Sequence, residues 1–298
     1  MATESFDPRF RGLDARDDAE VLATLLAAQG DALASVGAAA PAIAAAARAV
    51  AATLARGTGR LVYAGAGTSA RLGVQDGVEL VPTFGWPRDR LAFLVAGGMA
   101  ALTVAVEGAE DDAAAAARDA RRLDLGPADV AIVLSASGRT PYAVAACAAA
   151  RAAGALTVAF ANNAGAPLLA AAAHGILLDS GAEPVAGSTR MGAGTAQKVA
   201  LNILSTLAMT RMGRVYDGLM VDMVATNDKL RQRARRMVAA ISGVEEEAAA
   251  AALEAAGGHV KTAALVAHGV PAEAARLLLD DTGGDLRAAL ARLPERRG

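Results

Sequence analysis

Two short segments combine glycines with hydroxyl side chains, and this pairing of residue types is typical of sites that bind anions. The first segment, residues 65–69, reads GAGTS, and the second, residues 135–141, reads SASGRTP. Glycines let the backbone turn tightly, and the N–H groups at the start of a following helix attract negative charge. Phosphate is the natural occupant, whereas an ordinary capped helix start is the alternative for the first turn taken alone. The residues that we expect to hold the phosphate are Gly67, Thr68, Ser69, Ser135, Ser137, Gly138 and Thr140.

Neither segment matches the usual nucleotide-binding motifs. A P-loop needs Gly-Lys-Ser/Thr after its four-residue spacer, and neither segment has it. The first segment also lacks the third glycine of a dinucleotide-binding turn, and no acidic residue ends the apolar run that follows it. The sequence therefore predicts a phosphate-containing ligand other than a nucleoside triphosphate or a dinucleotide.

The elements that must position these segments are short apolar runs that alternate with stretches of helical composition. Such alternation is typical of strand–helix repeats and of a parallel sheet covered on both faces. We therefore predict an α/β fold, a three-layer αβα sandwich with a five-stranded parallel sheet. Both hydroxyl-rich turns would then lie at the same edge of that sheet, where ligands of open α/β folds bind. The expected strands are residues 61–64, 91–95, 130–134, 156–160 and 175–178.

The sequence on either side of the strands indicates further parts of the chain. Residues 1–56 read as an N-terminal arm followed by helices, and residues 57–240 as the sheet domain, which ends in a long helical zone from Gly192 to Arg236. Residues 243–298 read as a small all-α module of four short helices, because glycines break the pattern near positions 257, 269 and 283.

Composition excludes several classes of protein. The net charge of −2 argues against a nucleic-acid surface, which needs many unpaired cations. The single cysteine, Cys147, excludes an internal disulfide, and three scattered histidines lack metal-ligand spacing, so we expect no metal and no other cofactor. The longest charge-free run, residues 152–178, is interrupted by two asparagines, a glycine and a proline, so we expect no membrane span there. No signal peptide is visible, and we expect a cytoplasmic protein.

The motifs GAGTSARLG and SASGRTPY resemble those of the sugar isomerase (SIS) fold, which binds phosphosugars. Within that fold the chain is similar to the N-acetylmuramic acid 6-phosphate etherase family, and the small C-terminal module resembles its ubiquitin-associated-like (UBA-like) helical domain. The chain departs from the family pattern at Ala70 (commonly glycine), at Leu80-Val81 (commonly Cys-Pro) and at Gly192 (often lysine). The segments that carry the resemblance also include TE at 3–4, LD at 13–14, PTFG at 82–85, AVEGAEDD at 105–112, GSTRMGAGTAQK at 187–198, LNILST at 201–206 and LMVDMVATNDKL at 219–230.

The resemblance implies a lyase that removes D-lactate from N-acetylmuramic acid 6-phosphate in cell-wall amino-sugar recycling. It places Glu79 as the proton donor and Glu110 as the second catalytic carboxylate. Taken alone, Glu110 could belong to a solvated acidic helix start, and Glu107 is the nearest competing carboxylate. Ser188, Thr189, Arg190 and Lys198 are further candidates for the substrate's phosphate or carboxylate, although the two cations could equally form surface or dimer ion pairs.

The resemblance also implies a homodimer whose site lies near the subunit boundary. The zone from Gly192 to Arg236 supplies a second reason, because it holds more apolar positions than one sheet face can cover. An aldose–ketose phosphosugar isomerase and a non-catalytic phosphosugar-binding regulator of the same fold remain the alternative functions. The apolar positions are Leu201, Leu204, Leu207, Met209, Met220 and Met223.

Overall fold

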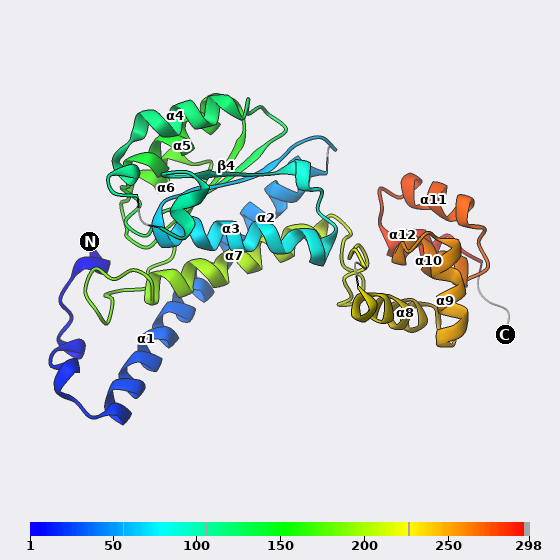
Figure 1. Cartoon of the computed structure of the whole chain (residues 1–298), viewed down its shortest axis with the longest axis horizontal. Coiled ribbons are helices and arrows are strands. Elements are labelled where there is room, and N and C mark those ends of the chain that lie inside the picture. The colour runs from blue at the N-terminus through cyan, green and yellow to red at the C-terminus, as the bar shows by residue number, and fades with distance from the viewer. Residues whose placement is uncertain (56, 105, 226, 295–298) are drawn as a thin grey trace. The chain divides into compact units, whose positions relative to one another are not determined.

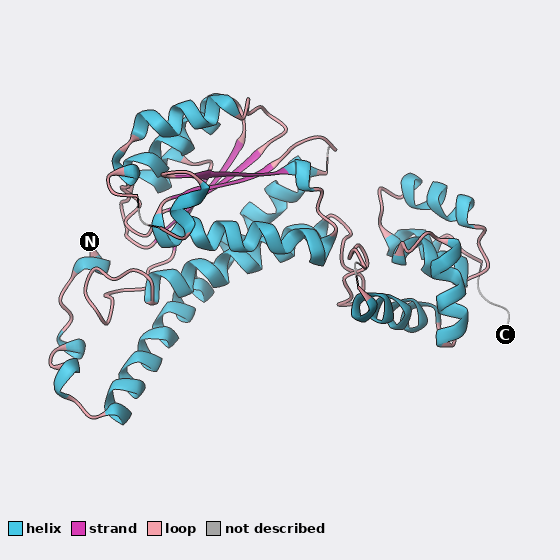
Figure 2. Cartoon of the chain, in the orientation of Figure 1, coloured by secondary structure: helices cyan, strands magenta, loops and turns pink. Residues whose placement is uncertain are grey.

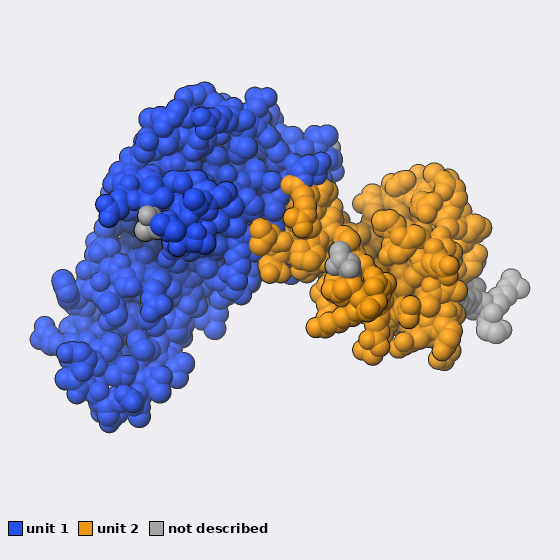
Figure 3. Space-filling model, in the orientation of Figure 1, with its two compact units in different colours: residues 1–77, 89–207 blue, residues 78–88, 208–298 orange. Residues whose placement is uncertain are grey.

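The computed structural model describes residues 1–55, 57–104, 106–225 and 227–294. Within them the chain forms two compact units. Unit 1 comprises Met1–Gly77 and Asp89–Leu207, and unit 2 comprises Val78–Arg88 and Ala208–Gly298 (Figure 3). Each unit is described by itself.

Unit 1 is built on a parallel sheet, and the expected strands are confirmed (Figure 2). In the described residues the sheet has five strands in the order β2-β1-β3-β4-β5. The central strands β1 and β3 are buried along their whole length, as expected for a sheet with helices on both faces. The strand bounds are β1 (Leu61–Gly65), β2 (Leu91–Val95), β3 (Val130–Leu134), β4 (Leu156–Ala161) and β5 (His174–Leu177).

Helices cover both faces of this sheet, which confirms the three-layer sandwich (Figure 1). One face packs against α5 (Pro141–Ala152), with α4 (Ala113–Arg122) and α6 (Pro167–Ala171) beside it. The other face packs against α2 (Ala40–Leu54) and the start of α3 (Gly67–Phe84), where Gly73 and Gly77 bring the helix close to Tyr63. The two glycines thus allow α3 to approach the sheet closely.

Cys147 lies on α5 in the first of these two layers. Its side chain is fully buried among alanines and valines of the core. Burial raises the pKa of the thiol to about 11, so the thiol is neutral at physiological pH. This placement fits a small apolar core residue rather than a nucleophile.

The strand order creates a switch point between β1 and β3. The chain leaves β1 for β2 on one side and returns to β3 on the other, so the two loops that follow β1 and β3 diverge at the carboxyl edge. Ligands of open α/β sheets bind at such points. The two hydroxyl-rich segments follow these two strands, as the sequence predicted.

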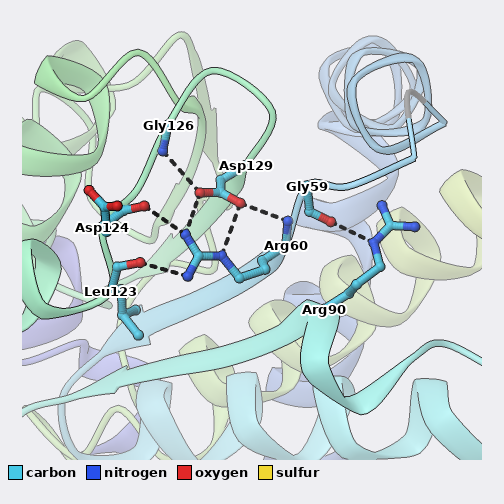
Figure 4. A network of polar contacts seen from close by, with 7 residues as sticks. All are labelled: Gly59, Arg60, Arg90, Leu123, Asp124, Gly126 and Asp129. Atoms are coloured by element: carbon cyan, nitrogen blue, oxygen red, sulfur yellow. Dashed lines mark hydrogen bonds and ion pairs between the residues drawn. The ribbon is translucent and has the colours of Figure 1, made fainter.

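The amino edge of the same two strands holds a closed network of charges (Figure 4). The guanidinium of Arg60 donates to the carboxylate of Asp129 at 2.7 Å and to the carbonyls of Leu123 and Asp124 at 2.6 and 2.9 Å. The Asp129 carboxylate also accepts the N–H groups of Arg60 and Gly126 at 2.7 and 3.0 Å. Burial alone would raise the pKa of Asp129, but these hydrogen bonds and the neighbouring cation lower it below its ordinary value.

The N-terminal part of unit 1 contains α1 (Asp18–Ala38). Among the described helices, α1 is the one long and apolar enough to cross a membrane by length and composition, a weak indication that core helices of soluble proteins share. Leu22, Leu26 and Leu33 form one stripe on its surface and are 60%, 70% and 56% exposed. The charge-free run at 152–178 folds as β4, α6 and β5.

Unit 2 contains the four short helices that the tail predicts, with breaks at the expected glycines. In addition, α8 packs against α9 and α10 and shares their core. The C-terminal stretch of unit 2 thus begins at residue 208, whereas the sequence placed a domain boundary between residues 240 and 243. The helices are α8 (Asp228–Ser242), α9 (Glu246–Ala255), α10 (Val260–Ala267), α11 (Ala272–Asp281) and α12 (Leu286–Ala291).

The long helical zone expected from Gly192 to Arg236 is interrupted, so that prediction was wrong in its middle. The helix α7 (Gly192–Arg211) ends before Gly213, and α8 begins at Asp228. Gly213, Asp217 and Gly218 between them have φ values of +72°, +49° and +77°, which a right-handed helix does not allow.

The apolar positions of this zone also supply little of the surface that was expected to need a partner. Leu201, Leu204 and Met209 are fully buried within the chain, and Met223 is nearly so. Leu207 and Met220 are half-buried and Ile203 on α7 is 46% exposed, so this zone gives only weak support for a dimer, which stays a prediction. The exposed apolar stripe lies on α1 instead.

Candidate functional site

A cavity of about 350 Å³ opens in unit 1 at the carboxyl ends of β1 and β3. Its walls come from both hydroxyl-rich turns, from the turn that carries Glu110, from the loop before α7 and from the N-terminal segment. The sequence analysis expected the first four of these parts and not the last. The lining residues are Glu4, Ala66, Gly67, Thr68, Ser69, Glu110, Leu134, Ser135, Ala136, Ser137, Thr140, Gly187 and Thr189.

The first turn brings the start of α3 to the cavity. A side chain at Gly65 would lie 2.9 Å from the carbonyl oxygen of Leu134, so only glycine lets the turn pass this close to β3. The N–H groups of residues 67–69 belong to the first turn of α3 and cannot be bonded within the helix. Ser69 is not a simple cap, because its hydroxyl donates to Oε1 of Gln197 at 2.8 Å. This turn thus offers backbone N–H groups and the Thr68 hydroxyl to an anion.

The second turn forms a cluster of three hydroxyl groups. Oγ of Ser135 lies 3.0 Å from Oγ1 of Thr140 and 3.3 Å from Oγ of Ser137. The Ser135 and Ser137 hydroxyls also accept backbone N–H groups of the turn. Gly138 does not line the cavity but shapes the turn, since its φ is +62° and a Cβ there would lie 2.4 Å from that of Ala166. These hydroxyls accept backbone N–H groups and otherwise contact one another, so their O–H groups can rotate to donate to an incoming phosphate.

Two carboxylates line the cavity. Glu110 lies in the short turn η6 (Ala109–Asp111), where Ala109 packs against the core and the glutamate stays exposed. Glu4 is the second, and the sequence analysis did not identify it as a site residue. Its only local signal was the TE pair that carries the family resemblance. Glu107, the competing carboxylate, is exposed and lies outside the lining.

Several predicted residues lie outside this cavity. Glu79 is exposed on α3, ten residues beyond Ser69, which at about 1.5 Å per residue is about 15 Å along the helix axis. Arg190 and Lys198 are exposed and Ser188 is half-buried, and none of them lines the cavity, whereas Thr189 does. The described residues that line the cavity therefore include no lysine or arginine.

The departures from the family pattern have local structural settings. Ala70 and Leu80 are buried, 4% and 2% exposed, so both act in packing. At Gly192 the backbone N–H donates to the buried carboxylate of Glu183 at 2.9 Å, and Ala193 donates to the same carboxylate at 2.8 Å. A side chain at position 192 would begin 3.4 Å from that carboxylate, so a lysine there would lie beside Glu183. Glu183 anchors the start of α7, a role that the sequence analysis missed.

Comparisons with known proteins agree with this geometry. Residues 42–151 match the glucokinase regulatory protein N-terminal SIS domain, and residues 99–207 match the SIS domain. The chain is 51% identical over 289 residues to an N-acetylmuramic acid 6-phosphate etherase of Deinococcus radiodurans, covering 97% of this chain and 94% of the relative. It is 48% identical over 295 residues to the same enzyme of Streptomyces avermitilis, covering 99% and 94%. A phosphoheptose isomerase structure from Francisella tularensis shares the fold, with 19% identity, a TM-score of 0.51, and coverage of 65% of this chain and 100% of that one.

Proposed function

The chain belongs to the N-acetylmuramic acid 6-phosphate etherase family, and from this premise we propose that it cleaves the D-lactyl ether of N-acetylmuramic acid 6-phosphate. The products are N-acetylglucosamine 6-phosphate and D-lactate. The observation that supports the proposal is the cavity at the switch point, where the carboxylate of Glu110 and the two hydroxyl-rich turns line the same space. We place this step in cytoplasmic amino-sugar recycling.

The chemistry requires a base and an acid acting on the open-chain form of the sugar. The C1 aldehyde acidifies the C2 proton, which Glu110 removes, and the released electron pair forms the C2–C3 double bond. The C3–O bond breaks, and Glu79 protonates the departing lactyl oxygen. Water then adds at C3, and a proton returns to C2. No carbon changes its overall oxidation state, so proton transfer suffices and we expect no redox cofactor.

Neutral donors hold the phosphate in this proposal. The candidates are the hydroxyls of Ser135, Ser137 and Thr140 and the N–H groups at the start of α3. Hydrogen bonds from such donors to a charged acceptor are about twice as strong as bonds between neutral groups. Arg190 and Lys198 then act outside the phosphate site, in contact with a partner subunit or with solvent.

Glu79 requires a second copy of the chain. Because α3 carries this residue about 15 Å away from the phosphate-binding turn along its own axis, we propose that the Glu79 carboxylate completes the cavity of another subunit in a homodimer. The exposed leucine stripe of α1 is the surface that we assign to this contact, because large apolar patches are rare on monomers. The active unit is thus a homodimer with composite sites.

The reaction is tested with N-acetylmuramic acid 6-phosphate in water enriched in oxygen-18. We expect release of D-lactate without the label and a sugar product labelled at C3, because the sugar carbon, not the lactyl carbon, loses its oxygen. Reaction in heavy water should also place deuterium at C2. Absence of D-lactate together with ketose formation would assign the chain to the isomerases, and tight binding without turnover would assign it to the regulators.

The composite site is tested by mixing two inactive variants, Glu79→Gln and Glu110→Gln, after dissociation and reassembly. If the two glutamates come from different subunits, each mixed dimer regains one intact site. Random pairing then restores about a quarter of the wild-type activity. No recovery in mixed dimers whose formation is verified by mass would confine both glutamates to one chain.

A further inference from the structure

The N-terminal segment is tied to the site by its third residue. Thr3 is fully buried, and its hydroxyl accepts a hydrogen bond from Nδ2 of Asn163 at 3.0 Å, while its N–H donates to Oδ1 of the same side chain at 3.4 Å. The Thr3 carbonyl accepts the N–H of Gly187 at 3.0 Å. Asn163 in turn donates to the carbonyl of Ala136, inside the second hydroxyl-rich turn, at 2.9 Å. The segment is therefore bonded to two walls of the cavity.

This anchor places the next residue, Glu4, in the cavity wall. Gly187 leaves the space for its carboxylate, because a Cβ on Gly187 would lie 2.8 Å from Oε2 of Glu4. Gly187 also has a φ of +78°, a conformation that residues with a side chain rarely adopt. The loop that contains Gly187 thus leaves room for the N-terminal segment, and the Glu4 carboxylate lines the cavity.

The charges of the cavity restrict what Glu4 can contact. The described lining residues carry two carboxylates, Glu4 and Glu110, and no lysine or arginine. A phosphate must therefore lie against the hydroxyl cluster and the helix N–H groups, since like charges repel and a carboxylate accepts hydrogen bonds without donating them. A part of the ligand that does donate, such as a sugar hydroxyl or an amide N–H, is the complement of Glu4.

We propose that Glu4 is a specificity-determining residue whose carboxylate accepts hydrogen bonds from the hydroxyl groups of the bound sugar phosphate. The ligand class rests on the proposed function. Glu4 then favours a phosphate ester that carries a polyhydroxyl chain over inorganic phosphate. The hydroxyl-rich turns bind inorganic phosphate equally well with or without the Glu4 carboxylate. The N-terminal segment does not have to move for Glu4 to contact the ligand, because the hydrogen bonds of Thr3 already hold it at the cavity.

The test compares two probes by calorimetry, N-acetylglucosamine 6-phosphate and inorganic phosphate, on the full-length wild type and on Glu4→Gln. We expect the variant to bind the sugar phosphate about tenfold more weakly and inorganic phosphate with unchanged or slightly higher affinity. In the lactate assay KM should rise by a similar factor, with kcat within about twofold of the wild type. Glu107→Gln, a nearby exposed glutamate outside the cavity, serves as the matched control and should change neither affinity.

Three outcomes would overturn the assignment. Equal weakening for both probes would mean that Glu4 supports the turns only as structure, and unchanged binding of both would mean that it contacts no ligand. A lower melting temperature for Glu4→Gln, similar to that of Thr3→Val, would also assign it to anchoring. The proposed function is judged separately, by whether the wild type binds the sugar phosphate and releases lactate at all.

Discussion

The strands β1 and β3 carry polar residues at both ends, and the two ends differ in kind. At the amino edge, Arg60 and Asp129 meet as opposite charges, and each finds further partners in the backbone. At the carboxyl edge, the residues that follow the same strands offer hydroxyl and N–H groups to a cavity, with Ser135 and Thr140 bonded mainly to each other. One edge is closed, and the other is left open for a ligand.

The residues that precede β1 and β3 therefore contribute mainly to stability, and the residues that follow the same short strands contribute mainly to function. A buried ion pair that loses one partner leaves an uncompensated charge, so the amino edge tolerates little change. Neutral hydroxyl groups at an empty site lower the stability of the fold only slightly, because they can form hydrogen bonds with one another or with water. Substitutions at one edge should therefore change the free energy of unfolding, and substitutions at the other should change binding and turnover.

The largest expected effect is on turnover, at the open edge. Replacing Glu110 with glutamine removes the proposed base and should lower kcat for lactate release by about 10²–10⁴-fold. Its exposure in the short turn η6 means that the melting temperature should change by less than about 2 °C. Steady-state kinetics and calorimetric unfolding measure the two quantities. A variant that keeps half of the wild-type kcat would remove Glu110 from the reaction.

The next effect is on stability, at the closed edge. Asp129→Ala leaves the partly buried guanidinium of Arg60 without its carboxylate and frees two backbone N–H groups. We expect the free energy of unfolding to fall by about 2–4 kcal/mol, with kcat per folded molecule unchanged. Urea unfolding provides the measurement, with Asp124→Asn as the control, because the carbonyl of Asp124 accepts the hydrogen bond from Arg60 and asparagine tolerates the φ of +48° at this position. Equal losses in both variants would contradict a specific role for the Asp129 carboxylate.

A smaller effect is expected on binding at the open edge. Ser137→Ala removes one hydroxyl of the cluster and should weaken the binding of N-acetylglucosamine 6-phosphate by about 1–2 kcal/mol, which is about 5–30-fold. Stability should change little, since beyond its neighbours in the hydroxyl cluster the Ser137 hydroxyl accepts a turn N–H, that of Arg139, at 3.1 Å. Calorimetric titration decides the matter, and an affinity equal to that of the wild type would place the phosphate elsewhere.

The smallest effect concerns pH. The pKa of Asp129 is lowered in the folded state, so its ionised form contributes stability that is complete above the pKa of an unfolded aspartate, about 3.9. That contribution is lost as the pH falls through the lower, folded-state pKa. Between pH 5 and pH 2 the wild type should therefore lose more stability than Asp129→Asn, whose side chain does not titrate in this range. Parallel unfolding curves for the two proteins across this range would show that Asp129 does not titrate as described.

Much of the sheet could be predicted from the sequence because its signals are local. Short apolar runs rich in valine and leucine, separated by glycines and helical stretches, predict β1 to β5 within one residue or so at each end. Glycine breaks likewise predict α9 to α12. The placement of both turns at one edge followed from the parallel sheet, which the repeating strand–helix pattern predicts, whereas the strand order was seen only in the structure.

The errors have two causes, local backbone conformations that composition hides and contacts between residues far apart in the chain. Residues 212–227 have apolar, helix-compatible composition, but glycines and Asp217 with positive φ interrupt the helix there. Arg190 has suitable charge and spacing for an anion site, yet charge does not reveal which way a loop faces. Glu4 reaches the cavity through the pairing of Thr3 with Asn163, 160 residues away, which no local pattern encodes.

The buried thiol of Cys147 is a natural probe for local opening of the sheet domain. It is the only cysteine of the chain, it is fully buried on α5, and its pKa of about 11 leaves very little thiolate at neutral pH. A thiol reagent can therefore modify the native protein only when the layer between α5 and the sheet opens. The labelling rate at increasing reagent concentration reports how often that layer opens, and a bound sugar phosphate that bridges the turns before α3 and α5 should slow it.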